Sequence, residues 1–323
     1  MKKIISYMFI VLLLLVCVFT FSGCKKDDKV KIGIVQYVTH DSLDTIRDAI
    51  VKELEAQGFK DGDNCQIIFE NGNAQASSIA SIMSSLNAKN VDVIVAIATP
   101  TAMEAIKYSD KIPVVFAAVS DPTDILASGD MVTGTSDAIQ VELILDYMLQ
   151  IMAANEKSFS KLGFIYNPSE ANSVTNLAKI QAYLSNTSIE LVAKTISNSS
   201  ELELSARTLA EQVDAIFITD DNTVASAMSV LANVANEKKI PLFCGVDSEV
   251  NDGGLLTIGI NYENLGLETG KMVARILNGE SAKEIPYKVF DSNLKLFVNR
   301  KTLNTLNMQL ATYDGEVVYL EGK

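Results

Sequence analysis

The polar side chains that could bind a small molecule gather where short apolar runs of this 323-residue sequence end. In the first half of the chain these groups are mainly neutral: Gln36, Tyr37, His40, Thr99, Pro100, Thr101, Ser120 and Asp121. In the second half four acids stand among them: Tyr166, Asn167, Glu170, Asn172, Asp220, Asp221, Asn222 and Asp247. Ligands of open parallel sheets lie beyond the carboxyl ends of the strands, so these residues form the candidate binding site.

The run Thr99-Pro100-Thr101 is typical of the start of a helix. Threonine caps a helix, proline fits its first position, and the free backbone N–H groups there attract an anion. An ordinary helix cap that binds nothing explains the same run equally well. In the binding interpretation, Thr99 and Thr101 hold a carboxylate.

The acids of the second half predict the opposite pole of a ligand. Asp221 and Asp247, and after them Glu170, are the candidates for a charge-assisted hydrogen bond to an ammonium group. Acids at such positions are also typical of helix caps and first turns. Tyr37 and Tyr166 offer flat apolar area, either to a ligand ring or to packing. An anion-binding wall facing an acidic wall predicts a zwitterion.

Composition excludes several classes of function. Lys and Arg number 27 against 40 Asp and Glu, a formal charge of -13, so we expect no nucleic-acid partner. With one histidine, His40, and four cysteines, we expect no metal site and no Cys–His catalysis. His40 either donates to a ligand carboxylate or lies at the surface. The sequence contains no glycine-rich phosphate loop and no Gly-x-Ser-x-Gly motif, and we expect no cofactor.

These groups must be positioned by alternating strands and helices. Short β-branched runs alternate with stretches that carry the 3.6-residue period of a helix, such as 44–57, 77–89, 101–108 and 263–277. This alternation predicts an α/β fold with parallel sheets covered on both faces. The expected strands are 30–36, 66–70, 91–97, 114–116, 161–166, 189–196, 215–218, 242–245, 255–260, 287–290 and 294–298.

Three strand motifs of the first half recur in the same order in the second half. The matching pairs are 31–37 with 161–167, 91–95 with 213–217, and 112–116 with 240–244. The repeat predicts two similar lobes, each a parallel sheet flanked by helices, joined by a multi-strand hinge. We expect the first lobe to hold residues 30–134 and about 261–288, and the second lobe 135–260 and about 289–323.

The start of the chain predicts export and a lipid anchor. Two lysines precede an apolar run that ends in Ser22-Gly23-Cys24, which is typical of a bacterial lipoprotein signal peptide over residues 1–23. Cleavage leaves Cys24 acylated at the head of a charged tether, residues 24–29. The alternative is an uncleaved membrane-spanning anchor. Of the other cysteines in the exported part, Cys65 and Cys244 are either buried thiols or a disulfide.

Several passages together are similar to one known family. The most specific is Tyr166-Asn167-Pro168-Ser169-Glu170-Ala171-Asn172-Ser173. The others are 33–36, 40–44, 98–102, 112–116, 119–122, 132–137, 219–223 and 258–262. On these passages the sequence resembles the ABC-transporter substrate-binding lipoproteins of the tryptophan/tyrosine type, built on the type I periplasmic-binding-protein fold. The resemblance adds Ser136 to the candidate site.

The resemblance implies a receptor rather than an enzyme. Such a receptor captures an amino acid (Trp, Tyr or Phe) between its lobes and delivers it to an ABC permease and its ATPase. It implies a monomer outside the cytoplasm, held to a bacterial membrane by the lipid on Cys24. Three alternatives stay open: a receptor for another small solute, a sensor subunit, and a lipid-anchored hydrolase that uses the acids of the second lobe.

Overall fold

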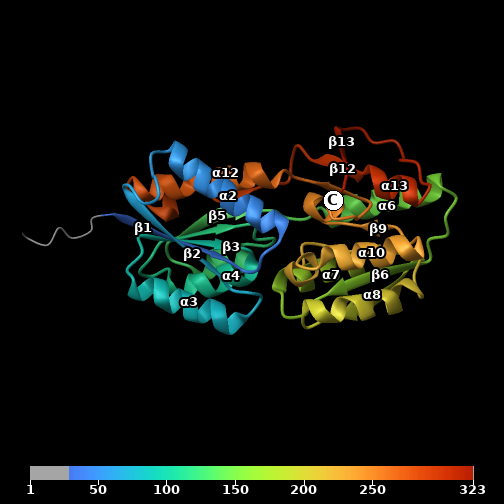
Figure 1. Cartoon of the computed structure of the whole chain (residues 1–323), viewed down its shortest axis with the longest axis horizontal. Helices are drawn as coiled ribbons and strands as arrows, with labels where there is room; N and C mark the ends of the chain where they lie inside the picture. The colour runs from blue at the N-terminus through green and yellow to red at the C-terminus, as the bar shows by residue number, and fades with distance from the viewer. Residues whose placement is uncertain (1–28, 323) are drawn as a thin grey trace, which may run out of the picture.

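The computed structural model describes residues 29–322, so the predicted signal peptide, Cys24 and most of the predicted tether lie outside the described residues. The described chain forms two lobes that lie side by side along the long axis of the molecule (Figure 1). Each lobe is a sheet dominated by parallel strands and flanked by helices. The predicted α/β class with two similar lobes is confirmed.

The sheet of the first lobe has the strand order β11-β5-β4-β3-β1-β2, and all its strand pairs are parallel. Its strands are β1 (Val30–Gln36), β2 (Cys65–Asn71), β3 (Val93–Ile97), β4 (Val114–Ala117), β5 (Val132–Ser136) and β11 (Lys288–Val289). Its helices are α2 (Asp41–Ala56), α3 (Ala76–Ala88), α4 (Thr99–Ala105), α5 (Thr123–Ser128) and α12 (Tyr262–Leu277).

The sheet of the second lobe has the order β13-β12-β10-β9-β8-β6-β7, and only the β10–β12 pair is antiparallel among its described strands. Its strands are β6 (Lys161–Tyr166), β7 (Glu190–Thr195), β8 (Ala215–Phe217), β9 (Leu242–Phe243), β10 (Leu256–Gly259), β12 (Lys295–Asn299) and β13 (Val317–Leu320). Its helices are α6 (Val141–Ala154), α7 (Ala171–Leu184), α8 (Leu202–Ala210), α9 (Asn222–Ala225), α10 (Met228–Lys238), α11 (Asp247–Asn251) and α13 (Arg300–Thr305).

The central strands are apolar along their whole length because helices cover both faces of each sheet. All five residues of β3, Val-Ile-Val-Ala-Ile, are buried, as are all four residues of β4. Such continuous apolar runs are typical of parallel sheets, which bury both faces. This packing fixes the carboxyl ends of the strands, where the candidate site residues begin.

The chain passes between the lobes three times, through 137–140, 260–261 and 290–294. After the second passage, α12 packs against α2 of the first lobe, as Figure 1 shows. Two glycines permit this approach, since a Cβ atom on Gly266 would lie 2.6 Å from the carbonyl oxygen of Ile46 and one on Gly270 would lie 2.7 Å from the Cβ of Glu53. Helix α12 therefore ties the C-terminal part of the chain to the first lobe.

The predicted boundary after Gly134 is two residues too early. Thr135 pairs with Ala117 of β4, and both Thr135 and Ser136 pair with β11, so the first sheet continues to Ser136. Val289 of β11 likewise belongs to the first sheet, one residue beyond the predicted return at about 288. The first passage between the lobes therefore begins after Ser136, the last residue of β5.

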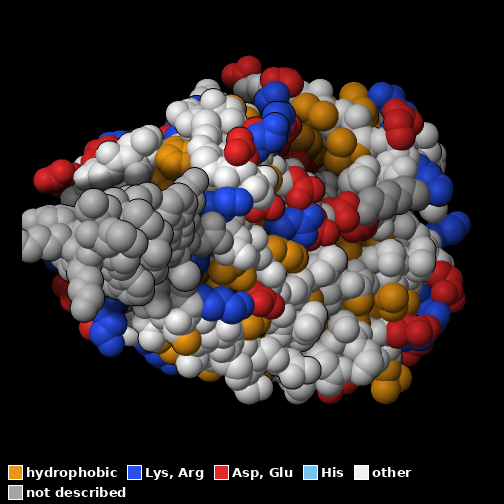
Figure 2. Space-filling model, turned by 60° about the vertical axis from the view of Figure 1, so that its left-hand side comes forward, with side chains coloured by type: hydrophobic (Ala, Val, Ile, Leu, Met, Phe, Trp, Pro, Cys, Tyr) orange, Lys and Arg blue, Asp and Glu red, His pale blue; other side chains and the backbone are white. Residues whose placement is uncertain are grey.

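Cys65 and Cys244 are free buried thiols, not a disulfide. Over residues 29–322, no helix has both the length and the apolar character needed to cross a membrane. Figure 2 shows acidic and basic side chains interspersed over one face of the molecule.

Candidate functional site at the junction of the lobes

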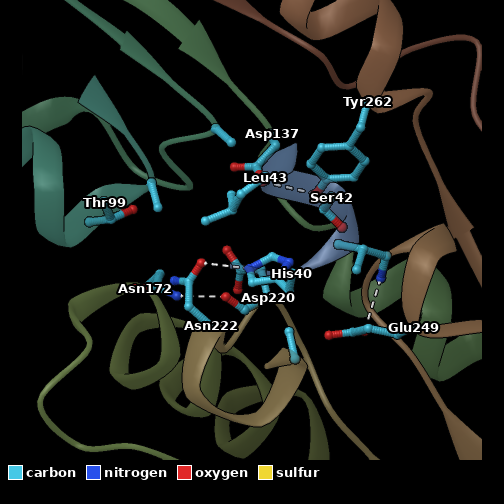
Figure 3. A pocket seen from close by; sticks show the side chains of 14 residues that line it. His40, Ser42, Leu43, Thr99, Asp137, Asn172, Asp220, Asn222, Glu249 and Tyr262 are labelled. Carbon is cyan, nitrogen blue, oxygen red and sulfur yellow. Dashed lines mark hydrogen bonds between the residues drawn. The ribbon is translucent and has the colours of Figure 1, made fainter. Parts of the chain in front are cut away.

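A central cavity lies between the lobes, at the carboxyl ends of their strands. Its volume is about 340 Å³, counting the part open to solvent. Both lobes and the first passage between them supply its walls. The lining residues are His40, Ser42, Leu43, Ala98, Thr99, Ala118, Asp137, Asn172, Asp220, Asn222, Ala225, Val246, Glu249 and Tyr262 (Figure 3).

The lobes touch one another directly around this cavity. His40 Nε2 lies 3.1 Å from Asn222 Oδ1, and Ser42 Oγ lies 2.5 Å from Ser248 Oγ. Ser120 of the first lobe donates a hydrogen bond to Asp220 of the second. These bonds join residues 100 to 206 positions apart in sequence, and they hold the lobes in a closed arrangement.

In the first lobe, two strands end in unusual backbone turns at the cavity wall. Ala98 follows β3 with φ 77°, and Ala118 follows β4 with φ 53°, both in the left-handed region that alanine rarely adopts. Ala98 is the residue before α4, so Thr99 begins the helix and does not cap it with its side chain. The predicted threonine cap is therefore wrong, and the Thr99 hydroxyl is left facing the cavity without a partner among the described residues.

Three carboxyl groups line the cavity, and no Lys or Arg does so within the described part of the chain. Burial, with the nearby charge of Asp220, raises the pKa of Asp137 to about 7. Burial also raises the pKa of Asp220 and holds that of Glu249 well above its usual range. Desolvated acids without a basic partner favour a ligand group that carries positive charge and hydrogen-bond donors.

Two of these acids each keep one oxygen without a hydrogen-bond partner in the described structure. Asp137 Oδ2 accepts a bond from the Tyr262 hydroxyl at 2.9 Å, and Oδ1 accepts none. Glu249 Oε2 accepts bonds from the backbone N–H groups of Gly245 at 3.2 Å and Val246 at 3.3 Å, and Oε1 accepts none. Both residues are at least 96 % buried, so bulk solvent does not reach these oxygens.

Asp220 is satisfied within the protein. Its Oδ1 accepts a bond from Asn176 Nδ2 at 2.7 Å, and its Oδ2 accepts the bond from Ser120. The amide of Asn172 donates to the Asp220 backbone carbonyl at 2.8 Å. Asp220 therefore contributes charge to the cavity and helps to join the lobes.

A chain of hydrogen bonds fixes the proton on His40. Glu170 Oε2 accepts a bond from Asn222 Nδ2 at 2.6 Å, which turns Asn222 Oδ1 toward His40. His40 Nε2 must then donate, because an amide oxygen only accepts. Burial lowers the pKa of His40, so the ring is neutral and its Nδ1 is an acceptor without a partner among the described residues. Thus His40 does not present a donor to a carboxylate through Nδ1.

Of the seventeen predicted binding residues, the structure brings a subset to the cavity wall: His40, Thr99, Asn172, Asp220 and Asn222. Two predicted acids lie behind the wall instead. Glu170 Oε1 accepts bonds from the Thr223 N–H and hydroxyl, while Asp221 caps α9 through Val224 N–H at 2.9 Å and also accepts from Ser173. Their bonds are internal, so they shape the loop that presents Asn222.

Asp247 lies on the outer side of α11. It lines a second, surface pocket of about 730 Å³ including open solvent, together with Ser42, Ser248 and Tyr262. Burial raises the pKa of Asp247 to about 6. The Ser42–Ser248 bond lies between this pocket and the central cavity, so Asp247 is near the entrance rather than at the cavity wall.

The remaining predicted residues support the wall from behind or lie apart from it. Gln36 donates to Asp44 of α2, Asn167 donates to Thr223, and Asp121 accepts from the N–H of Thr123 at the start of α5. Tyr166 stacks on Phe164 within the second lobe. The others are Tyr37, Thr101, Ser120 and Ser136, which are buried, and Pro100, which is half-buried in the first turn of α4.

Sequence reasoning missed several lining residues, above all Asp137, Glu249 and Tyr262. Asp137 directly follows β5, so the rule that ligands bind beyond strand ends would have found it once that strand was recognised. Glu249 stands two residues after Asp247 in a short helix, and residues two apart on a helix point to different sides. Within residues 29–322, no group of three or more His, Cys, Asp or Glu side chains is arranged to hold a metal ion.

Comparisons with known proteins agree with this geometry. The family model described as ABC transporter substrate binding protein matches residues 31–314. A tyrosine-binding protein of Clostridioides difficile (strain R20291) is 35% identical over 299 residues, covering 90% of this chain and 85% of the relative. A solved ABC domain from Streptococcus pneumonia in complex with L-Trp is 29% identical, with a TM-score of 0.80 over 90% of this chain and 100% of that one.

A second solved relative differs in state. It is the ligand-free, open structure of a substrate-binding protein with adhesive properties from Clostridium difficile, 35% identical, with a TM-score of 0.62 over 91% of this chain and 100% of that one. The present structure is thus nearer in shape to the ligand-bound relative, despite the lower identity. The lobes bond to one another directly around a cavity at their junction, and the family model matches nearly all of the described chain. The chain therefore belongs to the ABC transporter substrate-binding proteins, an extracytoplasmic solute-binding family rather than an enzyme family.

Proposed function

We propose that this protein captures an aromatic L-amino acid between its lobes and delivers it to an ABC permease and its ATPase. The observation that carries the proposal is the cavity itself, which is lined by three acids and no basic side chain among the described residues. Relatives named for tyrosine binding and solved with L-Trp support an aromatic amino acid as the ligand.

The ammonium group of the ligand would bind at Asp137. This carboxyl group has a buried oxygen without a partner in the described structure, and the charge of Asp220 acts on the same place. A charge-assisted bond there is stronger than a neutral one, and it also removes the cost of the unpaired oxygen. The role predicted for Asp221 and Asp247 thus passes to Asp137 and Asp220.

The carboxylate of the ligand would bind near the start of α4. Thr99 offers a hydroxyl without a partner in the described structure, and the turn at Ala98 brings the first residues of the helix to the wall. The ring would lie against apolar side chains of both lobes, chiefly Leu43, Val246 and Tyr262. Such walls suit an aromatic ring, since they offer apolar area around a few polar groups.

The proposal also includes attachment of the mature chain to the membrane that holds the permease. The Ser22-Gly23-Cys24 sequence supports a mature chain that is acylated on Cys24 and held to the outer side of a bacterial membrane. The charged tether then lets the two lobes reach a permease in the same membrane.

Isothermal titration of the mature protein with the twenty amino acids tests the proposal. We expect one site per chain and binding restricted to aromatic L-amino acids, each recovered unchanged after dialysis. At a ligand concentration of about 100 Kd, the free energy of unfolding rises by about 2.7 kcal/mol. Binding of a different solute class, or conversion of the amino acid into a product, would contradict the proposal.

A further inference from the structure

Glu249 has a feature that its structural role does not explain. Its carboxyl oxygen Oε2 accepts the N–H groups of Gly245 and Val246 and so stabilises the start of α11. One oxygen is enough for this capping role. The other oxygen, Oε1, is buried at the cavity wall and has no partner in the described structure, and Figure 3 shows it directed toward the interior of the cavity.

A buried acceptor without a donor costs free energy, and a ligand that supplies the donor recovers it. Two side chains of the cavity carry such a carboxyl oxygen, Asp137 and Glu249. They come from different parts of the fold, Asp137 from the passage after β5 and Glu249 from α11. Figure 3 shows Asp137 above His40 and Glu249 below it, so separate donor groups of one ligand would reach the two oxygens.

Glu249 also lies far from the proposed carboxylate end. Thr99 and Glu249 stand on opposite sides of the cavity in Figure 3, with His40, Leu43 and Asp220 between them. The ammonium and carboxylate groups of an α-amino acid are on the same carbon, so a ligand whose carboxylate is at Thr99 would reach Glu249 through its side chain. When the α-carbon lies near Thr99 and Asp137, the distal part of the side chain points toward Glu249.

We propose that Glu249 Oε1 accepts a hydrogen bond from the ring of the ligand, an indole N–H or a phenol O–H, so that the protein discriminates against phenylalanine. This inference rests on the proposed function. Val246 and Ala225, which line the cavity with Glu249, give the ring apolar contact. Burial and the charge of Asp220 raise the pKa of Glu249, but even a protonated carboxyl oxygen keeps a lone pair for the ring donor.

Titration of the wild-type protein with matched ligands gives the first test. In 3-benzothienyl-L-alanine a sulfur atom replaces the indole N–H of tryptophan at nearly the same size. We expect L-Trp to bind at least about tenfold more tightly than this analogue, and L-Tyr or L-Trp to bind more tightly than L-Phe by a similar factor, because the analogue and L-Phe leave Oε1 unpaired. Equal affinities for L-Trp and the analogue would overturn the inference.

Two variants give the second test. Glu249→Gln keeps an oxygen for the Gly245 and Val246 N–H groups but turns an NH₂ donor toward the ring, so the affinity ratio of L-Trp to the analogue should fall to about one. Asp137→Asn should weaken binding of both ligands by the same factor and keep the ratio. If Glu249→Gln lowers the affinity for L-Phe as much as for L-Trp, Glu249 binds the ammonium group and the inference is wrong.

The tests separate failure of this inference from failure of the proposed function. Binding of all three aromatic amino acids with equal affinity would leave the proposed function intact and remove the role of Glu249. If no aromatic amino acid binds, both the inference about Glu249 and the proposed function are wrong. Should Glu249→Gln not fold, as judged by its melting curve, the wild-type comparison of L-Trp with its sulfur analogue still decides.

Discussion

Asp137 combines three properties that mark it as the centre of the site. It is buried, one of its oxygens is unpaired among the described residues, and its other oxygen accepts a bond from Tyr262 at the start of α12. The residue thus connects the ligand cavity to two of the passages between the lobes. A ligand ammonium at Asp137 would act on the hinge as well as on the acid.

Asp137→Asn should weaken binding of an aromatic amino acid by tenfold or more, because a neutral amide replaces the charged partner of the ammonium. Isothermal titration measures the change. Asp247→Asn is the matched control, because Asp247 lines the outer pocket. We expect this variant to bind the amino acid with nearly wild-type affinity. A larger loss in Asp247→Asn than in Asp137→Asn would favour the assignment predicted from sequence.

The buried acids also predict how stability depends on pH. Burial raises the pKa of Asp137 to about 7, that of Asp221 to about 8 and that of Asp247 to about 6, from a usual value of 3.8. A raised pKa means that the folded state binds protons more tightly than the unfolded chain. The contribution of these acids to the free energy of unfolding is therefore fully present below about pH 4, and it is lost as the pH rises through 6 to 8.

The ligand-free protein should accordingly melt at a lower temperature at pH 8.5 than at pH 5, by roughly 3 °C or more. Differential scanning calorimetry across this range measures the shift. An ammonium ligand favours the ionised acids, so its stabilising effect should grow over the same interval. A melting temperature that rises steadily from pH 5 to 8.5 without ligand would contradict this account.

At the scale of elements, most of the correct predictions concern the parallel strands. The strand expected over 30–36 forms as β1, and that over 161–166 forms as β6, because each is a largely apolar run of the length typical of a buried strand. β5 and α6 were not predicted. β5 contains Gly134 and three hydroxyl residues, so it lacks the apolar run that indicates a strand.

The position of the site could be predicted, but two of its three acids, Asp137 and Glu249, were missed. Strand ends of parallel sheets share one edge, which is why His40, Thr99, Asn172, Asp220 and Asn222 reach the cavity. The bond from Tyr262 to Asp137 joins the start of α12 to the residue after β5, 125 residues earlier in the sequence. Such contacts between segments more than a hundred residues apart leave no local signal.

The α2–α12 contact should depend on Gly266. A Cβ atom at this position would lie 2.6 Å from the Ile46 carbonyl oxygen and 2.7 Å from the Ala49 Cβ, so larger residues force the helices apart. Gly266→Val should lower the free energy of unfolding by about 2 kcal/mol or more, measured by urea denaturation. Asn264→Ala on the exposed side of α12 is the control and should change it by less than about 0.5 kcal/mol.

At the scale of the whole molecule, the proposed attachment to the membrane would depend on Cys24, which lies outside the described residues. Cys24→Ala removes the thiol that would take the lipid. We expect the precursor to remain uncut or the mature protein to appear in the soluble fraction, as shown by cell fractionation and intact mass. A variant that stays in the membrane fraction with the wild-type mature mass would rule out the lipid anchor.

Closure is the other property of the whole molecule. The lobes are held together by the His40–Asn222, Ser42–Ser248 and Ser120–Asp220 bonds, and the passages between them at 137–140, 260–261 and 290–294 contain no helix or strand. Three polar bonds at an interface supply little net free energy, since water satisfies the same groups when the lobes separate. In the proposed binding mode, ligand contacts to Asp137 and Thr99 on one side and to residues of α9 and α11 on the other would add the missing stabilisation.

The ligand-free protein should therefore open, as the ligand-free relative does, and close when an aromatic amino acid binds. Small-angle scattering should give a radius of gyration near 19 Å for the closed, bound chain, the value expected of a compact protein of this length, and a larger one without ligand. Ser42→Ala removes one bond between the lobes without reaching the proposed ammonium site and should shift the ligand-free ensemble further toward the open state. Identical scattering profiles with and without saturating ligand would mean that the lobes do not move, and the bonds between them would then be permanent parts of the fold.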